Sequence, residues 1–242
     1  MGTLSAVLDG RSIAIVVPAF CEERLLGTTL ASLPSFVDWI CVVDDASTDR
    51  TWDVARRQHD SRISVTRHRR NRGVGAAIVS GYYRALQYGA DVIVVMAGDG
   101  QMSPGDLNRL VQPILSGRAD YVKGDRLRHP KATQMPALRR LGSRTLALLT
   151  SWAAGVRIAD SQCGFTAFSG PALARLPLDR LWPRYGYPND LVLMCVTHGL
   201  RVAEVAVEPV YADERSGLRP WHMLSIAWLT LHRKNRYRLA RP

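Results

Sequence analysis

The chain has 242 residues, of which 47% are hydrophobic, and a formal net charge of +11. This length suits one large α/β domain with a short appendage, and no run reaches the roughly 20 apolar residues that a membrane-spanning helix needs. The 4 cysteines are widely spaced and form neither a CxxC pair nor a zinc set, so we expect reduced thiols in a cytoplasmic protein. The first residues lack a basic region followed by an apolar stretch, so no signal peptide is expected.

The positive charge comes almost entirely from arginine, because Lys123, Lys131 and Lys234 are the only lysines. An excess of cations indicates anionic partners, which include nucleic acid, anionic lipid and phosphorylated substrates. Arginine suits phosphate in particular, since its planar fork donates two parallel hydrogen bonds.

In chain order, apolar strand-like runs alternate with helix-like segments, which predicts a largely parallel sheet covered by helices. In the first half we expect strands at 13–17, 40–43, 63–67 and 92–96, and helices at 23–33, 51–58, 74–88 and 105–116. The second half predicts a short strand at 121–123, a mobile basic loop at 126–134, a helix at 136–154, a strand near 164–168, a helix at 189–198 and a closing strand at 202–207. Residues 1–215 form the predicted domain and 216–242 a basic, amphipathic appendage.

Three of the predicted strands end in polar loops, at 18–23, 44–49 and 97–101. In open parallel sheets, ligands collect at the carboxyl ends of the strands. Asp44 directly follows an apolar strand, so its carboxylate is a candidate for a hydrogen bond to a ribose or a base edge. The later polar residues of that loop fit a turn and a helix cap.

The stretch VVMAGDGQMSP, residues 94–104, looks like a strand that runs into a metal-binding turn. The turn holds one carboxylate, Asp99, and one amide, Gln101, and Ala97 stands where a second acid would be expected. An isolated Asp binds a divalent ion poorly, because hard cations prefer several oxygen ligands. If this turn binds a metal, another molecule must supply the missing oxygens.

The order and spacing of six motifs resemble the family-two glycosyltransferases of GT-A fold, and the nearest branch is that of the polyprenyl-phosphate (dolichyl-phosphate) sugar synthases. The motifs lie between about residues 12 and 215 and read IAIVVPAFCEE, VVDDASTDRT, NRGVGAA, VVMAGDGQMSPGDL, SQCGFTAF and GYPNDLVL. The resemblance implies an α/β GT-A fold with a mostly parallel central sheet flanked by helices, to which the tail adds an amphipathic C-terminal helix.

The resemblance implies a donor site at the first sheet loops. Pro18, Ala19 and Glu22 would line the nucleoside pocket, and Asp44 would contact the base or ribose. Two further residues of the predicted donor site belong to the basic turn before residue 74: Arg72, which either reaches a phosphate or is solvated, and Gly73, which allows a tight turn. Cys21 departs from the family, which usually has Asn at this place.

Asp99 stands at the second acid of the family's Asp-x-Asp metal motif and Gln101 at its following Gln, whereas Ala97 replaces the first acid. A sugar nucleotide brings its own diphosphate oxygens, so Asp99, Gln101, two phosphate oxygens and waters can complete an octahedral shell around Mg²⁺ or Mn²⁺. We therefore expect weak metal binding without nucleotide. The alternative is an inactive enzyme.

The predicted acceptor-phosphate site consists of Lys123, Arg126, Arg140 and Arg144, with Arg139 in the same basic group. Asp190 occupies the family's late acidic position near the reacting sugar, so Asp99 and Asp190 are the predicted catalytic residues. A phosphate acceptor is already an anionic nucleophile, and Asp190 would then orient the sugar or acceptor rather than act as a base.

The predicted reaction is inverting transfer of a hexose or N-acetylhexosamine from a nucleotide sugar to a polyprenyl phosphate at the cytoplasmic face of the membrane. UDP-glucose, UDP-N-acetylhexosamine, UDP-galactose and GDP-mannose all remain possible donors. One alternative is a soluble glycosyltransferase with a hydroxyl acceptor and Asp190 as base. Another is a non-catalytic nucleic-acid-binding protein. The arginines argue against this alternative, because they are dispersed and form no recognised module.

The tail combines apolar and basic residues at helical spacing. Trp221, Leu224, Trp228 and Leu231 can share one face, and Arg233, Lys234, Arg236 and Arg238 follow. An apolar stripe with tryptophan and a polybasic end predicts a helix that lies in the headgroup layer of an anionic membrane. The alternative is that the stripe packs on the domain or on a second subunit.

Overall fold

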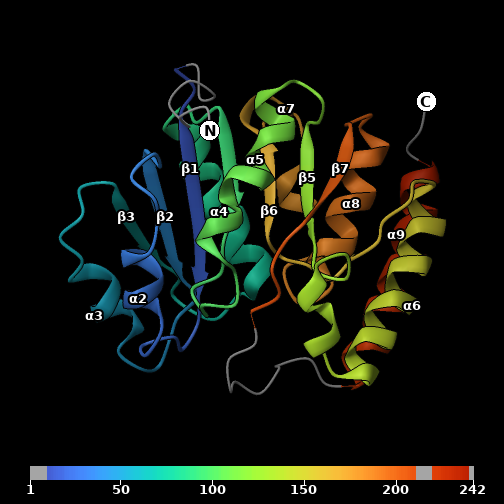
Figure 1. Cartoon of the computed structure of the whole chain (residues 1–242), viewed down its shortest axis with the longest axis horizontal. Coiled ribbons are helices and arrows are strands. Elements are labelled where there is room, and N and C mark those ends of the chain that lie inside the picture. Colours follow the sequence, from blue (N-terminus) through green and yellow to red (C-terminus); the bar gives the residue numbers. More distant parts are fainter. Residues whose placement is uncertain (1–9, 211–219, 240–242) are drawn as a thin grey trace.

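A central sheet of seven strands in the order β3-β2-β1-β4-β6-β5-β7 organises the molecule, and helices cover both of its faces (Figure 1). The computed structural model describes residues 10–210 and 220–239, and the side chains of the last helix from 223 to 234. The strands are β1 (Ile13–Ala19), β2 (Trp39–Asp44), β3 (Ile63–Arg67), β4 (Val92–Val95), β5 (Tyr121–Asp125), β6 (Thr166–Ser169) and β7 (Val202–Ala206).

The helices alternate with the strands. They are α2 (Leu26–Ala31), α3 (Thr51–Arg56), α4 (Val74–Gln87), α5 (Leu107–Leu115), α6 (Ala137–Ala154), α7 (Gly170–Leu173), α8 (Tyr187–Thr197) and α9 (Pro220–Leu239), with 3₁₀ turns η1 (Pro104–Asp106), η2 (Pro130–Gln134) and η3 (Leu178–Arg180). The predicted mixed α/β architecture with a C-terminal helix is confirmed.

Strand β6 is the exception to parallel pairing, since it runs antiparallel to both β4 and β5. The other neighbouring strands pair in parallel. The carboxyl ends of β1, β2 and β4 therefore meet at one edge of the sheet, and the polar loops that follow them lie together there.

Two apolar cores, one on each face of the sheet, hold the layers together. Alternate residues of β1 serve the two cores, because successive side chains of a strand point to opposite faces. Ala14 and Val16 pack with Ile78 and Tyr82 of α4. On the other face, Ile13, Ile15 and Val17 pack with apolar side chains of α2 and α5. Fully buried β1 thus reads as a continuous apolar run, as parallel strands do.

Helix α2 begins three residues later than the sequence predicts, because Glu22 and Glu23 are held by the segment that leads from β2 into α3. The Glu22 backbone N–H donates to Thr51 Oγ1 (2.7 Å), and the Glu23 backbone N–H donates to Asp49 Oδ2 (3.2 Å). These bonds tie the loop after β1 to the start of α3. The expected basic loop at 126–134 also differs, since it contains η2.

Helix α9 packs against α6 and α8. Its Ile226, Leu229 and Arg233 are buried, and a Cβ placed on Gly142 of α6 would lie 2.7 Å from Met223 Cε, so the two helices approach closely there. Within the described residues, every helix is too short or too polar to cross a bilayer.

Candidate active site

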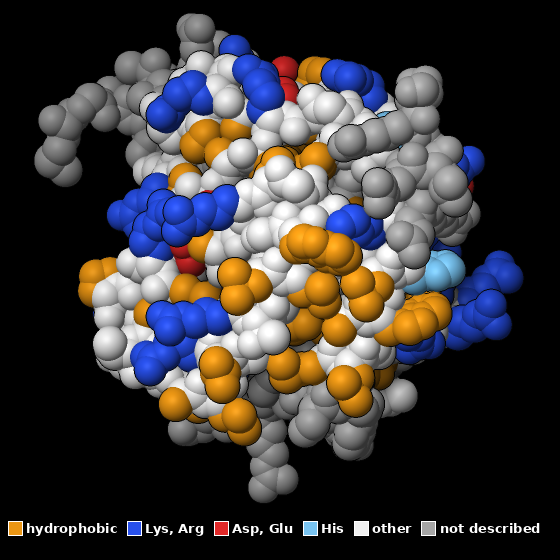
Figure 2. Space-filling view, turned by 90° about the vertical axis from the view of Figure 1, so that its right-hand side faces the viewer, with side chains coloured by type: hydrophobic (Ala, Val, Ile, Leu, Met, Phe, Trp, Pro, Cys, Tyr) orange, Lys and Arg blue, Asp and Glu red, His pale blue; other side chains and the backbone are white. Residues whose placement is uncertain are grey.

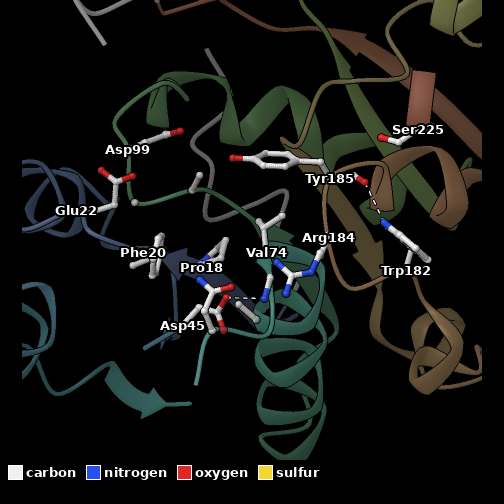
Figure 3. Close-up of a pocket in the computed structure, with 16 residues that line it drawn as sticks. Pro18, Phe20, Glu22, Asp45, Val74, Asp99, Trp182, Arg184, Tyr185 and Ser225 are labelled. Carbon is white, nitrogen blue, oxygen red and sulfur yellow. Dashed lines mark hydrogen bonds between the residues drawn. The ribbon is translucent and has the colours of Figure 1, made fainter. Parts of the chain in front are cut away.

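A cavity of about 600 Å³ opens at the carboxyl ends of β1, β2 and β4 (Figure 3). This volume lies in the usual range for small-molecule sites. The lining residues come from the strand-end loops, the start of α4, the segment before α8, and α9: Pro18, Ala19, Phe20, Glu22, Asp45, Asn71, Gly73, Val74, Ala77, Ala97, Gly98, Asp99, Trp182, Arg184, Tyr185 and Ser225. The structure thus brings the predicted Pro18, Ala19, Glu22, Gly73 and Asp99 to one cavity.

The loop after β1 contains a strained residue next to this cavity. Cys21 adopts φ 58°, in the left-handed region, which asparagine enters more readily than most residues. The Cys21 backbone N–H donates to Ser47 Oγ (2.9 Å), and its Sγ lies 3.6 Å from Thr48 Oγ1. The backbone bond therefore holds the loop although Asn is absent.

Asp45, rather than the predicted Asp44, faces the cavity. Asp44 has no exposed surface; its Oδ1 accepts from the Ser47 backbone N–H (2.9 Å) and its Oδ2 lies 3.0 Å from Arg67 Nε. The prediction that Asp44 contacts the ligand is therefore corrected, because this carboxylate binds Ser47 and Arg67 inside the fold.

The Asp45 carboxylate is fixed by three groups. Its Oδ1 accepts from the Arg72 backbone N–H (2.8 Å) and its Oδ2 from that of Gly73 (2.7 Å). His68 Nδ1 lies 2.6 Å from Oδ1, and the other ring nitrogen lies 2.9 Å from Ser80 Oγ. A rigidly held acid in a pocket wall is suited to accept an N–H or O–H from a ligand.

The basic turn before α4 contributes backbone to the site. The Arg72 side chain is exposed and does not line the cavity. Gly73 adopts φ 95°, and a Cβ there would lie 2.4 Å from the Pro183 carbonyl oxygen. A Cβ on Gly75 would lie 2.3 Å from the Trp182 carbonyl oxygen. Glycine is therefore required where α4 meets the segment before α8, in line with the tight turn predicted at Gly73.

Asp99 also lines a smaller cavity, of about 50 Å³, together with Gln101, Arg126 and Arg139. The Gln101 backbone N–H donates to Asp99 Oδ1 (3.0 Å). Two carboxylates (Asp99 and Glu208), one amide and two guanidinium groups thus converge beside the larger cavity, and Glu208 is ion-paired with Lys131. This set can hold a divalent cation and the phosphate groups of two substrates at once.

The fit of Mg²⁺ or Mn²⁺ depends on this donor set. Among the side chains that the structure describes, in 10–210 and 223–234, no three of His, Cys, Asp or Glu gather as a metal site, and the side chain of Ala97 carries no oxygen. Asp99 and Gln101 supply two oxygens, and a hard cation takes six or more. The residues therefore fit an ion that binds jointly with the oxygens of a diphosphate.

Arg126 is held by a buried acid. Its Nε donates to Asp160 Oδ2 (2.7 Å) and its Nη2 to Asp160 Oδ1 (3.0 Å). Burial would raise the pKa of Asp160, but the charge and hydrogen bonds of Arg126 outweigh it, so the pKa lies below its usual value. Asp160 thus stays ionised and fixes the guanidinium at the rim of the smaller cavity.

Lys123 is not available to an acceptor phosphate, contrary to the prediction. Its side chain is 0% exposed, its Nζ donates to the Cys163 carbonyl oxygen (2.7 Å), and burial lowers its pKa. Arg140 is half-buried and Arg144 is exposed on α6, and neither lines the two cavities. Within this basic group, Arg126 and Arg139 reach the smaller cavity.

Asp190 is fully buried in the first turn of α8 and lines neither cavity. Its Oδ2 accepts from the Trp182 backbone N–H (2.8 Å), and its Oδ1 lies 3.1 Å from Arg233 Nε. In this structure Asp190 holds the segment that carries Trp182 and Tyr185, which line the cavity, instead of facing a reacting sugar itself.

A family model described as glycosyl transferase family 2 matches residues 14–165, more than half of the chain. The chain belongs to glycosyl transferase family 2. The matched segment contains most of the cavity loops, from Pro18 to Asp99.

Several relatives of this family 2 glycosyltransferase resemble it over most of their length. An uncharacterised protein of Methanocaldococcus jannaschii is 34% identical over 83% of this chain and 82% of its own. The UDP-N-acetylglucosamine–dolichyl-phosphate N-acetylglucosaminyltransferase of Methanococcus voltae is 29% identical, over 83% and 86%. The undecaprenyl-phosphate mannosyltransferase of Micrococcus luteus is 30% identical, over 81% and 82%.

The fold also matches solved structures. Glucosyl-3-phosphoglycerate synthase from Mycobacterium tuberculosis, in complex with Mn²⁺, UDP-glucose and phosphoglyceric acid, superposes with a TM-score of 0.70 at 24% identity, over 98% of this family 2 glycosyltransferase and 82% of that chain. This likeness confirms the GT-A fold.

Proposed function

We propose that this family 2 glycosyltransferase transfers a hexose or N-acetylhexosamine from a UDP- or GDP-sugar to a polyprenyl phosphate, with inversion at the anomeric carbon. The observation that carries the proposal is the convergence of Asp99, Gln101, Arg126 and Arg139 beside a nucleotide-sized cavity. Relatives named for transfer to dolichyl and undecaprenyl phosphate support the acceptor class.

In the proposed reaction, Asp45 binds the base or ribose and the strand-end loops enclose the nucleoside. Asp99 and Gln101 hold Mg²⁺ or Mn²⁺ together with the donor diphosphate, and the ion would neutralise the charge that grows on the leaving group. A relative in fold that was crystallised with Mn²⁺ and UDP-glucose supports this cofactor class.

The acceptor needs no strong general base, because a phosphate monoester is already an anionic nucleophile. Arg126 and Arg139 would hold it opposite the donor through charge-assisted hydrogen bonds. A hydroxyl acceptor with Asp190 as base is less well supported, because Asp190 is buried and ion-paired with Arg233.

The proposal is tested by incubating the protein with undecaprenyl phosphate, Mn²⁺ and each of UDP-glucose, UDP-N-acetylglucosamine, UDP-galactose and GDP-mannose. Mass spectrometry is expected to detect one glycosyl undecaprenyl phosphate, and NMR of that product to show inversion. Transfer to a hydroxyl acceptor under the same conditions, with no lipid product from any donor, would contradict the proposal.

The acceptor assignment predicts a contrast between neighbouring arginines of α6. Arg139→Ala is expected to raise the KM for undecaprenyl phosphate by about tenfold or more, because a charge-assisted hydrogen bond contributes roughly 1.5–3 kcal/mol. The double variant R140A/R144A removes more charge outside the cavities, so it should change this KM much less. If both variants change the KM values for donor and acceptor equally, the assignment of Arg139 to the acceptor phosphate is wrong.

The lipid acceptor requires contact with a membrane, and the face formed by α6 and α9 suits it. The two helices lie side by side at one end of the molecule (Figure 1). Among its described side chains, this face, which we call the α6/α9 face, carries seven large exposed hydrophobic ones: Leu138, Leu141, Leu148, Trp152, Leu224, Trp228 and Leu231. Figure 2 shows hydrophobic side chains gathered across it, with Lys and Arg side chains along its margins.

The tail prediction is therefore extended to two helices. Leu224, Trp228 and Leu231 of the predicted stripe are exposed, whereas the side chains of Trp221, Arg236 and Arg238 lie outside the described residues. The opposite side of α9 packs on the domain through Ile226 and Leu229. We propose that the α6/α9 face lies in the headgroup layer at the cytoplasmic side of the membrane.

The α6/α9 face predicts a loss of vesicle binding when its tryptophans are removed. W152S/W228S is expected to weaken binding to anionic vesicles about 10²-fold, because burial of each large apolar side chain contributes roughly 1.5–3 kcal/mol. Cosedimentation with the vesicles measures the binding of each variant. Tyr83→Ser, which removes an exposed aromatic ring from α4, is the control. If both variants bind as the wild type does, another surface contacts the lipid.

A further inference from the structure

The wall of the larger cavity before α8 is clamped between two helices. On one side, the Pro183 carbonyl oxygen accepts from the Ala76 backbone N–H (3.2 Å), and Gly73 and Gly75, at the start of α4, press against the same segment. On the other side, Gly186 lies against α9, where an added Cβ would be 3.0 Å from Leu229 Cδ2 and 3.3 Å from Ile226 Cγ1. The position of this wall therefore depends on α9.

Arg233 of α9 is the polar link between that helix and the wall. Its side chain is 8% exposed, and its Nε lies 3.1 Å from Asp190 Oδ1. Its Nη2 donates to the Arg180 carbonyl oxygen (2.8 Å). Asp190 in turn accepts the backbone N–H of Trp182 through its other oxygen. One guanidinium thus fixes both Arg180 and, through Asp190, Trp182.

The segment held in this way forms one wall of the larger cavity. Trp182, Arg184 and Tyr185 line it, as does Ser225 of α9 itself, and Trp182 Nε1 donates to the Tyr185 carbonyl oxygen (3.0 Å). Figure 3 shows Trp182, Tyr185 and Ser225 on the side of the cavity opposite Phe20 and Glu22. A shift of Trp182 would therefore carry Tyr185 with it.

We propose that Arg233 is a positioning residue of the donor site: through Asp190 it sets the Trp182–Tyr185 wall, so that the C-terminal helix completes the nucleotide cavity. This inference rests on the proposed function in that the cavity is taken to bind a nucleotide. The helix that presents Trp228 outward to lipid thus holds the donor wall with its buried side. Deletion of the helix would remove both roles, so point variants are needed to separate them.

The test is titration of UDP and of GDP, each with Mn²⁺, into wild type and Arg233→Met by calorimetry, in detergent-free buffer without lipid. We expect the variant to bind the preferred nucleotide about tenfold more weakly, because the wall must be ordered on binding. Hydrogen exchange should speed up at the amides of Trp182 and of 184–186 and stay unchanged in β1 and β4. Lys234→Met removes the same charge from the next residue of α9 and should leave the nucleotide Kd unchanged.

Arg233→Met leaves the Asp190 carboxylate buried without its cation, which destabilises the fold. If that variant does not fold, D190N/R233M, which removes both charges, takes its place with the same expected loss of affinity. A nucleotide Kd within twofold of wild type in either folded variant would overturn the inference. If the wild type binds neither UDP nor GDP, the proposed function fails instead.

Discussion

Replacing Asp99 with alanine is expected to lower kcat for sugar transfer by about 10³-fold or more, with little change in Tm. Asp99 lines both cavities, and its side chain is the carboxylate of the turn after β4. Without it, an ion bound together with the donor diphosphate would have only the Gln101 amide from this turn. The developing charge on the leaving group would then be poorly stabilised.

Steady-state transfer assays with saturating Mn²⁺, together with thermal unfolding, check this result. Turnover near that of the wild type would contradict the proposal that Asp99 is a metal ligand. Ala97→Asp is the matched gain-of-ligand variant: it places a second carboxylate in the cavity wall and should tighten Mn²⁺ binding in the absence of nucleotide. An unchanged Mn²⁺ titration would show that position 97 does not reach the ion.

Replacing Asp160 with asparagine is expected to lower the free energy of unfolding by about 3–5 kcal/mol at pH 7, because the Arg126 cation loses its buried partner. The Arg126 side chain is 18% exposed and the Asp160 side chain 0%. Lys123, buried nearby, also loses a compensating charge. The same variant should raise the KM for the lipid acceptor, because Arg126 is no longer fixed at the smaller cavity.

The pH dependence of this effect follows from the lowered pKa of Asp160. A carboxyl with a lowered pKa stabilises the fold above its unfolded value, near 3.8, and that contribution is lost as the pH falls through the folded value. The difference between wild type and variant should therefore be full at pH 6–7 and shrink below about pH 4. Urea unfolding at several pH values measures this difference in the free energy of unfolding.

Asp120→Asn provides the control for Asp160→Asn. Asp120 makes a comparable two-point contact with Arg201 Nε and Nη2, at 2.9 and 2.8 Å, but the Arg201 side chain is 58% exposed. Loss of this pair should cost far less, since water solvates the freed guanidinium. Equal destabilisation by the two variants would show that burial does not decide the effect.

The strand positions were predictable because hydrophobic runs record burial directly. β3 matches its predicted range, and β1, β2 and β4 differ by one or two residues at their ends. The direction of β6 (Thr166–Ser169) was not predictable in this way, because a four-residue strand reads the same whether it pairs in parallel or antiparallel. Its pairing depends on where the chain re-enters the sheet.

The choice between adjacent residues was the weak point of the site prediction. Asp44 is the last residue of β2 and Asp45 follows it, and side chains of successive residues point in opposite directions. The apolar pattern of the strand does not decide which of the two faces the ligand. The signal that could have found Asp45 is the acid pair itself, since one member of such a pair must point away from the other.

Burial of charge was the second weak point. Lys123 and Asp190 have residue types that suit substrate contact, yet each is 0% exposed. Their partners, the Cys163 carbonyl and Arg233, lie 40 residues or more away in the chain. Arg139 was grouped with Arg140 and Arg144, and only the rotation of α6 separates the residue at the cavity from those outside it.

The exposed position of Cys21, in the loop beside the large cavity, has a practical consequence. All four cysteines are free thiols; Cys21 is exposed, whereas Cys41, Cys163 and Cys195 are buried. Burial raises the pKa of each buried thiol, that of Cys41 to about 11, and only the thiolate is nucleophilic. A maleimide dye should therefore label the native protein at one site, in the loop between Phe20 and Glu22 that borders the large cavity. Such a dye would report cavity occupancy without an engineered cysteine.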